Sequence, residues 1–87
     1  MFTIKCKEVA DYWGDKMPMM AMEEAGELIQ AISKVERKSS GDSSLAMNNL
    51  IDEIGDMYIT LEALTKRYAI DPAAICERIG SKLNKKY

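Results

Sequence analysis

Two long segments of the 87-residue sequence repeat apolar residues at the period of an α-helix. In residues 18–38 the steps between them are four, three, four and three: Ala21, Ala25, Leu28, Ile32 and Val35. Residues 44–68 show the same steps: Leu50, Ile54, Met57, Leu61 and Leu64. This spacing places each set on one side of a helix, and no stretch alternates apolar and polar residues as a strand does. The sequence therefore predicts an all-α protein built around two long helices.

Two shorter helices are expected on either side of this pair. Thr3 can cap a first helix that runs to about Gly14, with four apolar positions: Ile4, Val9, Tyr12 and Trp13. Asp71 and Pro72 form an N-cap and first-turn pair that opens a last helix. Its expected inner face is Ala74, Ile75, Ile79 and Leu83. The polar stretch SSGDSS at 39–44 is the expected loop between the long helices.

These elements predict one domain over residues 1–87. We expect an antiparallel four-helix bundle-like subunit whose two long central helices carry the acidic motifs described below. So small a core is marginal alone, which makes self-association a reasonable expectation.

Charge and residue types exclude several classes of function. A net charge of −2 argues against a protein that acts mainly on nucleic acid. The chain has no histidine, which excludes histidine catalysis and ligation. Cys6 and Cys76 form no metal or redox spacing, so we interpret them as reduced core thiols. No signal-peptide core or membrane span is apparent. We therefore expect a cytoplasmic protein with no membrane partner.

Each long helix carries a pair of acidic residues beside its apolar stripe. Glu24 and Glu27 lie about 40° and 100° from the line of the first stripe, on one flank. Glu53 and Asp56 lie about 60° and 120° from the second, again on one flank. Like charges at this spacing repel, and partial burial raises the cost. A hard divalent cation would offset it, and oxygen ligands favour Mg²⁺ or Mn²⁺ over zinc. From the residues alone, a metal site and a solvated acidic face are equally good interpretations.

Two stretches, WGDKMPMMAMEEAGELIQAI and NNLIDEIGDMYITLEAL, resemble the MazG-like nucleoside triphosphate pyrophosphohydrolases. These all-α enzymes have an ExxE motif, a spacer and an ExxD motif, here Glu24-x-x-Glu27 and Glu53-x-x-Asp56. The resemblance covers roughly residues 12–64. It implies Mg²⁺-dependent cleavage of a (d)NTP to (d)NMP and pyrophosphate, with all four acids as metal ligands and catalytic residues. It also implies a homodimer or homotetramer in which a neighbouring chain helps to close the nucleotide pocket.

Other residues are candidates for contacts with the nucleotide. Trp13 is a candidate to stack on the base, and packing in the core is the competing interpretation. The candidate phosphate contacts are basic or polar residues near helix ends, where solvated side chains are equally expected: Lys34, Lys82, Asn84, Lys85 and Tyr87. Many relatives carry glutamine where this chain has Met17, which leaves recognition of the base open.

Two other functions remain open. Phosphoribosyl-ATP pyrophosphohydrolase belongs to the same superfamily, but that branch usually has a Tyr-His pair after its second acidic motif. This chain has no histidine, so we rank that activity low. A non-catalytic helical interaction module, with one face of the bundle serving as a partner interface, is the alternative of a different class.

Overall fold

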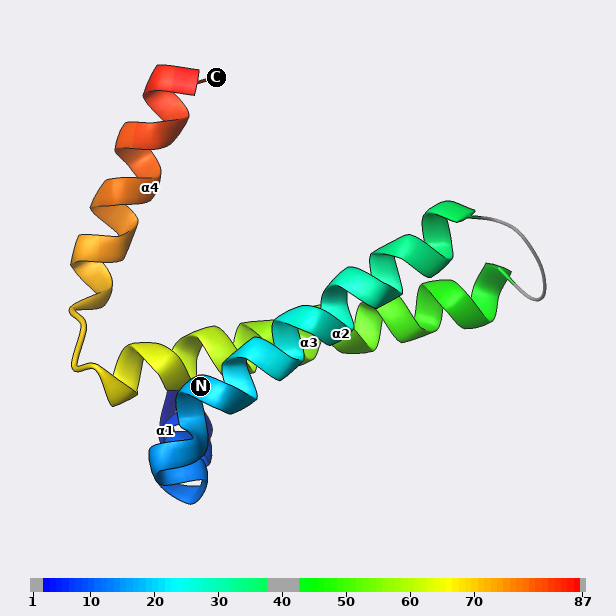
Figure 1. Cartoon of the computed structure of the whole chain (residues 1–87). Coiled ribbons are helices and arrows are strands. Elements are labelled where there is room, and N and C mark those ends of the chain that lie inside the picture. Colours follow the sequence, from blue (N-terminus) through cyan, green and yellow to red (C-terminus); the bar gives the residue numbers. More distant parts are fainter. Residues whose placement is uncertain (1–2, 38–42, 87) are drawn as a thin grey trace.

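The computed structural model describes residues 3–37 and 43–86, with the side chains of 8–37 and 44–85. The elements in these ranges are all helical: α1 (Thr3–Trp13), the 3₁₀ turn η1 (Gly14–Lys16), α2 (Met17–Arg37), α3 (Ser43–Arg67) and α4 (Pro72–Lys86) (Figure 1). No strand occurs among the described residues, so the prediction of an all-α fold is confirmed. None of the described helices combines the length and apolar character that crossing a membrane requires. Most of the expected loop at 39–44 lies outside the described residues.

The two long helices, α2 and α3, form an antiparallel hairpin (Figure 1). Their contact seam consists of half-buried side chains: Leu28 and Val35 on α2, and Leu50, Met57 and Leu64 on α3. Ala31 is buried in the same seam. The predicted stripes are only partly confirmed, because Ile32, Ile54 and Leu61 are 46%, 41% and 53% exposed. Two helices that touch along one line cover only the residues on that line, and the wider flank of each stripe stays uncovered.

The first helix crosses α3 near its C-terminal end and builds the small core there. Ala10, Met17 and Ala63 are buried together, and four partly buried side chains pack against them: Val9, Trp13, Ala21 and Leu64. The two alanines let the helix backbones approach closely, and the longer Met17 side chain fills the space between them. Tyr12 is 86% exposed, so its expected inward position was wrong.

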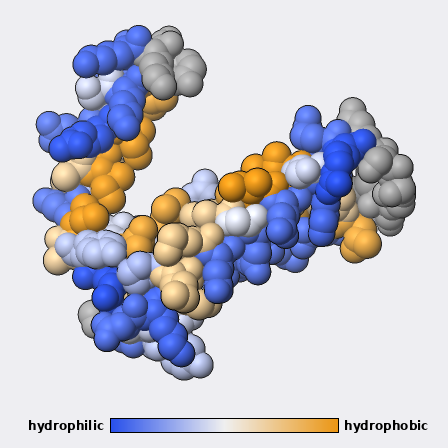
Figure 2. Space-filling model, in the orientation of Figure 1, coloured by the Kyte–Doolittle hydropathy of each residue, from blue (hydrophilic) through white to orange (hydrophobic). Residues whose placement is uncertain are grey.

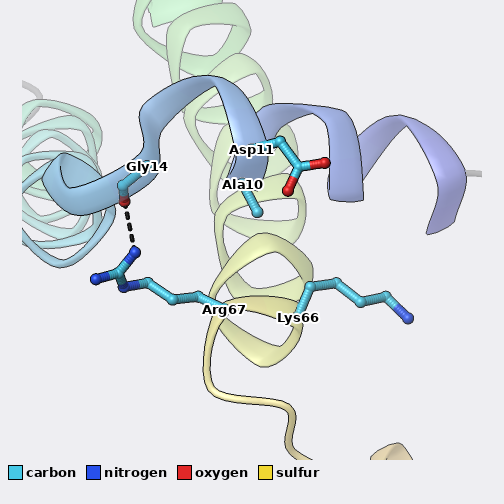
Figure 3. A pocket seen from close by; sticks show the side chains of 5 residues that line it. All are labelled: Ala10, Asp11, Gly14, Lys66 and Arg67. Atoms are coloured by element: carbon cyan, nitrogen blue, oxygen red, sulfur yellow. Dashed lines mark hydrogen bonds between the residues drawn. The ribbon is translucent and has the colours of Figure 1, made fainter.

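The turn after α1 is held by one arginine. Gly14 has a left-handed backbone (φ +51°), which favours glycine over residues with a Cβ. Nη1 of Arg67 donates a hydrogen bond of 2.7 Å to the carbonyl of Gly14, and Nη2 lies 3.5 Å from Oδ1 of Asp15. Figure 3 shows this arm reaching from α3 to the turn, while Lys66 extends the other way. Both cations line an open cavity of about 380 Å³ beside α1.

We expect Arg67→Ala to lower the free energy of unfolding by about 1–2 kcal/mol, because a charge-assisted hydrogen bond is lost. Asp15→Ala is the matched control. The Asp15 side chain is fully exposed, so removing its ion pair should leave the free energy of unfolding almost unchanged. Urea unfolding at one protein concentration measures both values. Equal losses in the two variants would show that the Gly14 contact does not matter.

The last helix points away from the other three. The C-terminus of α3 is capped by a turn in which Ala69 has a left-handed backbone (φ +51°). In this turn the Ala69 amide donates a hydrogen bond to the Lys66 carbonyl, and the Ile70 amide donates one to the Thr65 carbonyl. Asp71 Oδ1 then accepts a 3.0 Å hydrogen bond from Ala73 N, so the predicted N-cap is confirmed. The two caps fix the direction in which α4 leaves the hairpin (Figure 1).

Two expectations about α4 were wrong. Its intended inner side chains Ile75, Ile79 and Leu83 are 37%, 51% and 52% exposed, because no other described helix packs against them. Cys76 is exposed rather than buried. The described part of a single chain is therefore a hairpin with a crossing α1 and a projecting α4, and no four-helix bundle forms within it.

Candidate metal centre

Three glutamates from the two acidic motifs meet on one side of the hairpin. Glu24 and Glu27 lie one turn apart on α2, and Glu53 projects from the facing turn of α3. One carboxylate oxygen of each lies within 4.8 Å of the others. The antiparallel pairing places both motifs at the same level of the hairpin, which brings together residues 26 or more positions apart in sequence. Such a set of oxygens is a suitable ligand group for a hard divalent cation.

The carboxylates differ in how far they are shielded. Glu24 and Glu53 are half-buried, and Glu27 is exposed. Oε2 of Glu24 and Oε2 of Glu53 are both shielded from solvent, and neither accepts a hydrogen bond from the described residues. A shielded carboxylate oxygen without a donor is unfavourable, and a bound cation is one arrangement that satisfies it.

Charge repulsion acts on the same two residues. Burial, followed by the negative charges of Glu27 and Asp56, raises the pKa of the Glu24 carboxyl above its ordinary value of 4.5. Burial and the charges of the same two neighbours also raise the pKa of Glu53. Both causes disfavour the ionised form. Positive charge placed among the carboxylates would cancel the repulsion and offset the cost of burial.

The fourth predicted ligand, Asp56, lies beside this group. Its charge acts on both Glu24 and Glu53, but its oxygens do not join the group of three. Together with Glu24 it lines a cavity of about 200 Å³ between α1, α2 and α3. The fold thus brings the four predicted acids to one side of the hairpin, with three at a common point and Asp56 at the neighbouring cavity.

The cavity also contains residues that the sequence reasoning did not select. Besides the two acids, it is lined by Val9, Trp13, Ile59 and Thr60. Thr60 is buried, 1% exposed, and its hydroxyl donates a 2.7 Å hydrogen bond to the Asp56 carbonyl. On a helical wheel Thr60 lies between Glu53 and Asp56, so the same wheel could have identified Thr60 as a neighbour of the acids. Trp13 both lines the cavity and packs against the small core.

The basic candidates lie apart from the carboxylates. Lys34 is exposed on the same side of α2 as Glu27. It follows Glu27 by seven residues, which places it about 10 Å farther along the helix axis. Lys82, Asn84 and Lys85 are exposed on the projecting α4, away from the hairpin (Figure 1). Tyr87 lies outside the described residues. Within one chain, α4 does not bring its polar residues to the carboxylates.

No protein-family model, curated protein or solved structure matches the chain. The chemical interpretation of the site therefore rests on its geometry and on the two acidic motifs.

Proposed function

We propose that this protein is a Mg²⁺-dependent nucleoside triphosphate pyrophosphohydrolase of the MazG-like type, which cleaves a (d)NTP to (d)NMP and pyrophosphate. The observation that carries the proposal is the meeting of Glu24, Glu27 and Glu53, two of which hold shielded oxygens without a hydrogen-bond donor among the described residues. The resemblance of both motifs to that family supplies the reaction.

Glu24, Glu27 and Glu53 would hold the cation, with Asp56 next to them. Mg²⁺, or Mn²⁺ in its place, would neutralise charge on phosphate oxygens and would lower the pKa of a bound water. Glu27 is the exposed member of the group, so we assign its carboxylate the task of orienting the attacking water and accepting its proton. The more shielded carboxylates of Glu24 and Glu53 are assigned the role of cation ligands alone.

The cavity next to the carboxylates would receive part of the nucleotide. The Trp13 indole on its wall offers a flat surface for a base, and Glu24 and Asp56 stand on the same cavity lining. Lys34 is the basic candidate on the hairpin itself. Lys82, Asn84 and Lys85 lie on the projecting α4 and can serve only if a neighbouring chain of a homodimer or homotetramer supplies them. Tyr87, outside the described residues, stays a candidate. A cytoplasmic location would provide both nucleotides and Mg²⁺.

Release of pyrophosphate from a panel of ribo- and deoxyribonucleoside triphosphates tests this function. We expect release from at least one nucleotide with Mg²⁺ and none with excess EDTA. Thermal unfolding with and without Mg²⁺ is the companion measurement, because a ligand that binds only the folded state raises the melting temperature. If the protein is inactive and its melting temperature does not change with Mg²⁺, the alternative of a helical interaction module is favoured.

A further inference from the structure

The cavity beside the carboxylates is small and combines apolar walls with a few polar groups. Its volume is about 200 Å³, whereas drug-sized ligands occupy pockets of about 300–1,000 Å³. The flat Trp13 indole forms part of the apolar wall, and three side chains supply the polar groups: Glu24, Asp56 and Thr60. The cavity therefore has room for one ring system of a ligand and not for a whole nucleotide.

The polar groups of the cavity are almost all hydrogen-bond acceptors. The ionised carboxylates of Glu24 and Asp56 only accept. The Thr60 hydroxyl donates its one proton to the Asp56 carbonyl over 2.7 Å, so the capacity that remains to its oxygen is that of an acceptor. The surrounding backbone amides lie in helices, where they bond to carbonyls of the preceding turn. Among the described residues, the indole N–H of Trp13 is the one side-chain donor on the lining.

The charges on the lining exclude the phosphate end of a nucleotide. No cation belongs to the lining within the described part of the chain. The basic residues Lys82 and Lys85 are exposed on α4, which an open hollow separates from the hairpin (Figure 2). A phosphate group in the cavity would meet two carboxylates without a compensating positive side chain, and like charges repel. The part of a nucleotide that can enter is therefore its base.

Nucleobases differ in what they offer to a set of acceptors. Adenine, cytosine and guanine carry an exocyclic amino group, whose N–H bonds are donors. Hypoxanthine and uracil are the counterparts of adenine and cytosine in which a carbonyl oxygen replaces that amino group. A carbonyl oxygen placed against the carboxylate of Asp56 sets one acceptor against another and leaves a charged group without its hydrogen bond. The lining thus favours the amino-bearing bases.

We propose that this cavity selects nucleobases with an exocyclic amino group, which donates hydrogen bonds to Asp56 and Thr60 while the ring stacks on Trp13. Asp56 is suited to this task because its oxygens lie outside the group of three carboxylates. Thr60 is 1% exposed, and its bond to the Asp56 carbonyl fixes its hydroxyl on the cavity wall. The inference rests on the proposed function, since it names the base of the nucleotide to be cleaved.

Binding of nucleosides tests the preference without metal or catalysis. Trp13 is the only tryptophan of the chain, so quenching of its fluorescence reports on the cavity. Nucleosides carry the base and no phosphate, and two pairs differ only in the amino group: adenosine against inosine, and cytidine against uridine. The amino-bearing member of each pair should bind about 10-fold more tightly or better, the effect typical of one hydrogen bond to a charged group.

Substitutions on the lining should reduce this preference. Thr60→Val removes the acceptor, keeps the branched shape of the side chain, and should lower the affinity ratio within each pair about threefold. Thr65→Val is the matched control, because the Thr65 hydroxyl donates an equivalent 2.7 Å bond to the Leu61 carbonyl but does not line the cavity. Asp56→Asn, at an exposed residue, disturbs no buried packing and should lower the ratio further, because an amide presents both a donor and an acceptor.

Hydrolysis separates this inference from the proposed function. With Mg²⁺, kcat/KM should be higher for ATP than for ITP and higher for CTP than for UTP. Equal nucleoside affinities within each pair, no quenching by any nucleoside at millimolar concentration, or an equal fall in the ratio for Thr65→Val would each overturn the base preference, even in a protein that releases pyrophosphate. Preferential binding of adenosine and cytidine by a protein that releases no pyrophosphate would contradict the proposed function alone.

Discussion

Under the proposed function, replacing Glu24 or Glu53 by glutamine should reduce Mg²⁺-dependent pyrophosphate release by about 100-fold or more, because loss of a direct ligand should cost more than the 10–100-fold typical of losing a contact that supports a ligand. Glutamine keeps the size of the side chain and removes its charge. Both residues present a shielded oxygen at the point where the three carboxylates meet. Initial rates at saturating Mg²⁺ measure the loss.

Stability separates this effect from a structural defect. In metal-free buffer each glutamine variant should melt at a higher temperature than wild type, since one of the repelling charges has gone. Mg²⁺ should raise the melting temperature of wild type more than that of either variant. Glu23→Gln is the matched control, because Glu23 is the exposed neighbour of Glu24 and does not belong to the group of three. Full activity in the Glu24 and Glu53 variants, or an equal loss in the Glu23 variant, would refute the assignment.

The pH dependence of metal-free wild type should show the same repulsion. The pKa values of Glu24 and Glu53 are raised in the folded chain, so the folded state binds protons more readily than the unfolded state. The contribution of these two carboxyls to stability should therefore be fully present below the ordinary value of 4.5 and be lost as pH rises through the raised pKa values. Removal of either carboxylate should flatten this part of the curve relative to the Glu23 control.

The two long helices and the close approach of the acids could be predicted from the sequence, because both follow from the helical spacing of apolar and acidic residues. A helical wheel orders residues around one axis, and a short connection between two helices makes them neighbours. The wheel correctly placed Glu24, Glu27 and Glu53 on facing flanks. It did not determine that Asp56 would lie at the cavity and outside the group of three, because that depends on the small rotation of α3 against α2 and α1.

The position of α4 was not accessible in the same way. An amphipathic pattern shows that Ile75, Ile79 and Leu83 require a cover, but it does not say whether the cover belongs to the same chain. The expectation of an intrachain bundle assumed that it does. The direction of α4 is instead set by the left-handed Ala69 and by the Asp71 cap. Their geometry depends on backbone angles that apolar spacing does not encode. The same misplacement accounts for the exposed Cys76.

Met17 should have the largest effect on stability of any single side chain. It is fully buried, 0% exposed, between Ala10 and Ala63, where α1, α2 and α3 meet. Met17→Ala should lower the free energy of unfolding by about 2–5 kcal/mol, because it removes buried apolar contacts and leaves a cavity between helices that cannot close over it. Urea unfolding at a fixed protein concentration measures the change, since self-association would make stability depend on concentration.

Two further substitutions at this position separate volume from polarity. Met17→Leu nearly conserves volume and should cost less than about 1.5 kcal/mol. Met17→Gln introduces the residue that the MazG-like resemblance would place here, and it should be strongly destabilising because the amide would be buried against the apolar side chains of the core cluster. Met19→Ala, at a residue 61% exposed, is the control and should stay within about 0.5 kcal/mol of wild type. A glutamine variant as stable as the leucine variant would show that the amide at position 17 is hydrated or hydrogen-bonded, and would contradict the assignment of Met17 to the apolar core. If the prediction holds, Met17 is a packing residue, and under the proposed function Trp13 and Thr60, on the wall of the neighbouring cavity, are the candidates to contact a base.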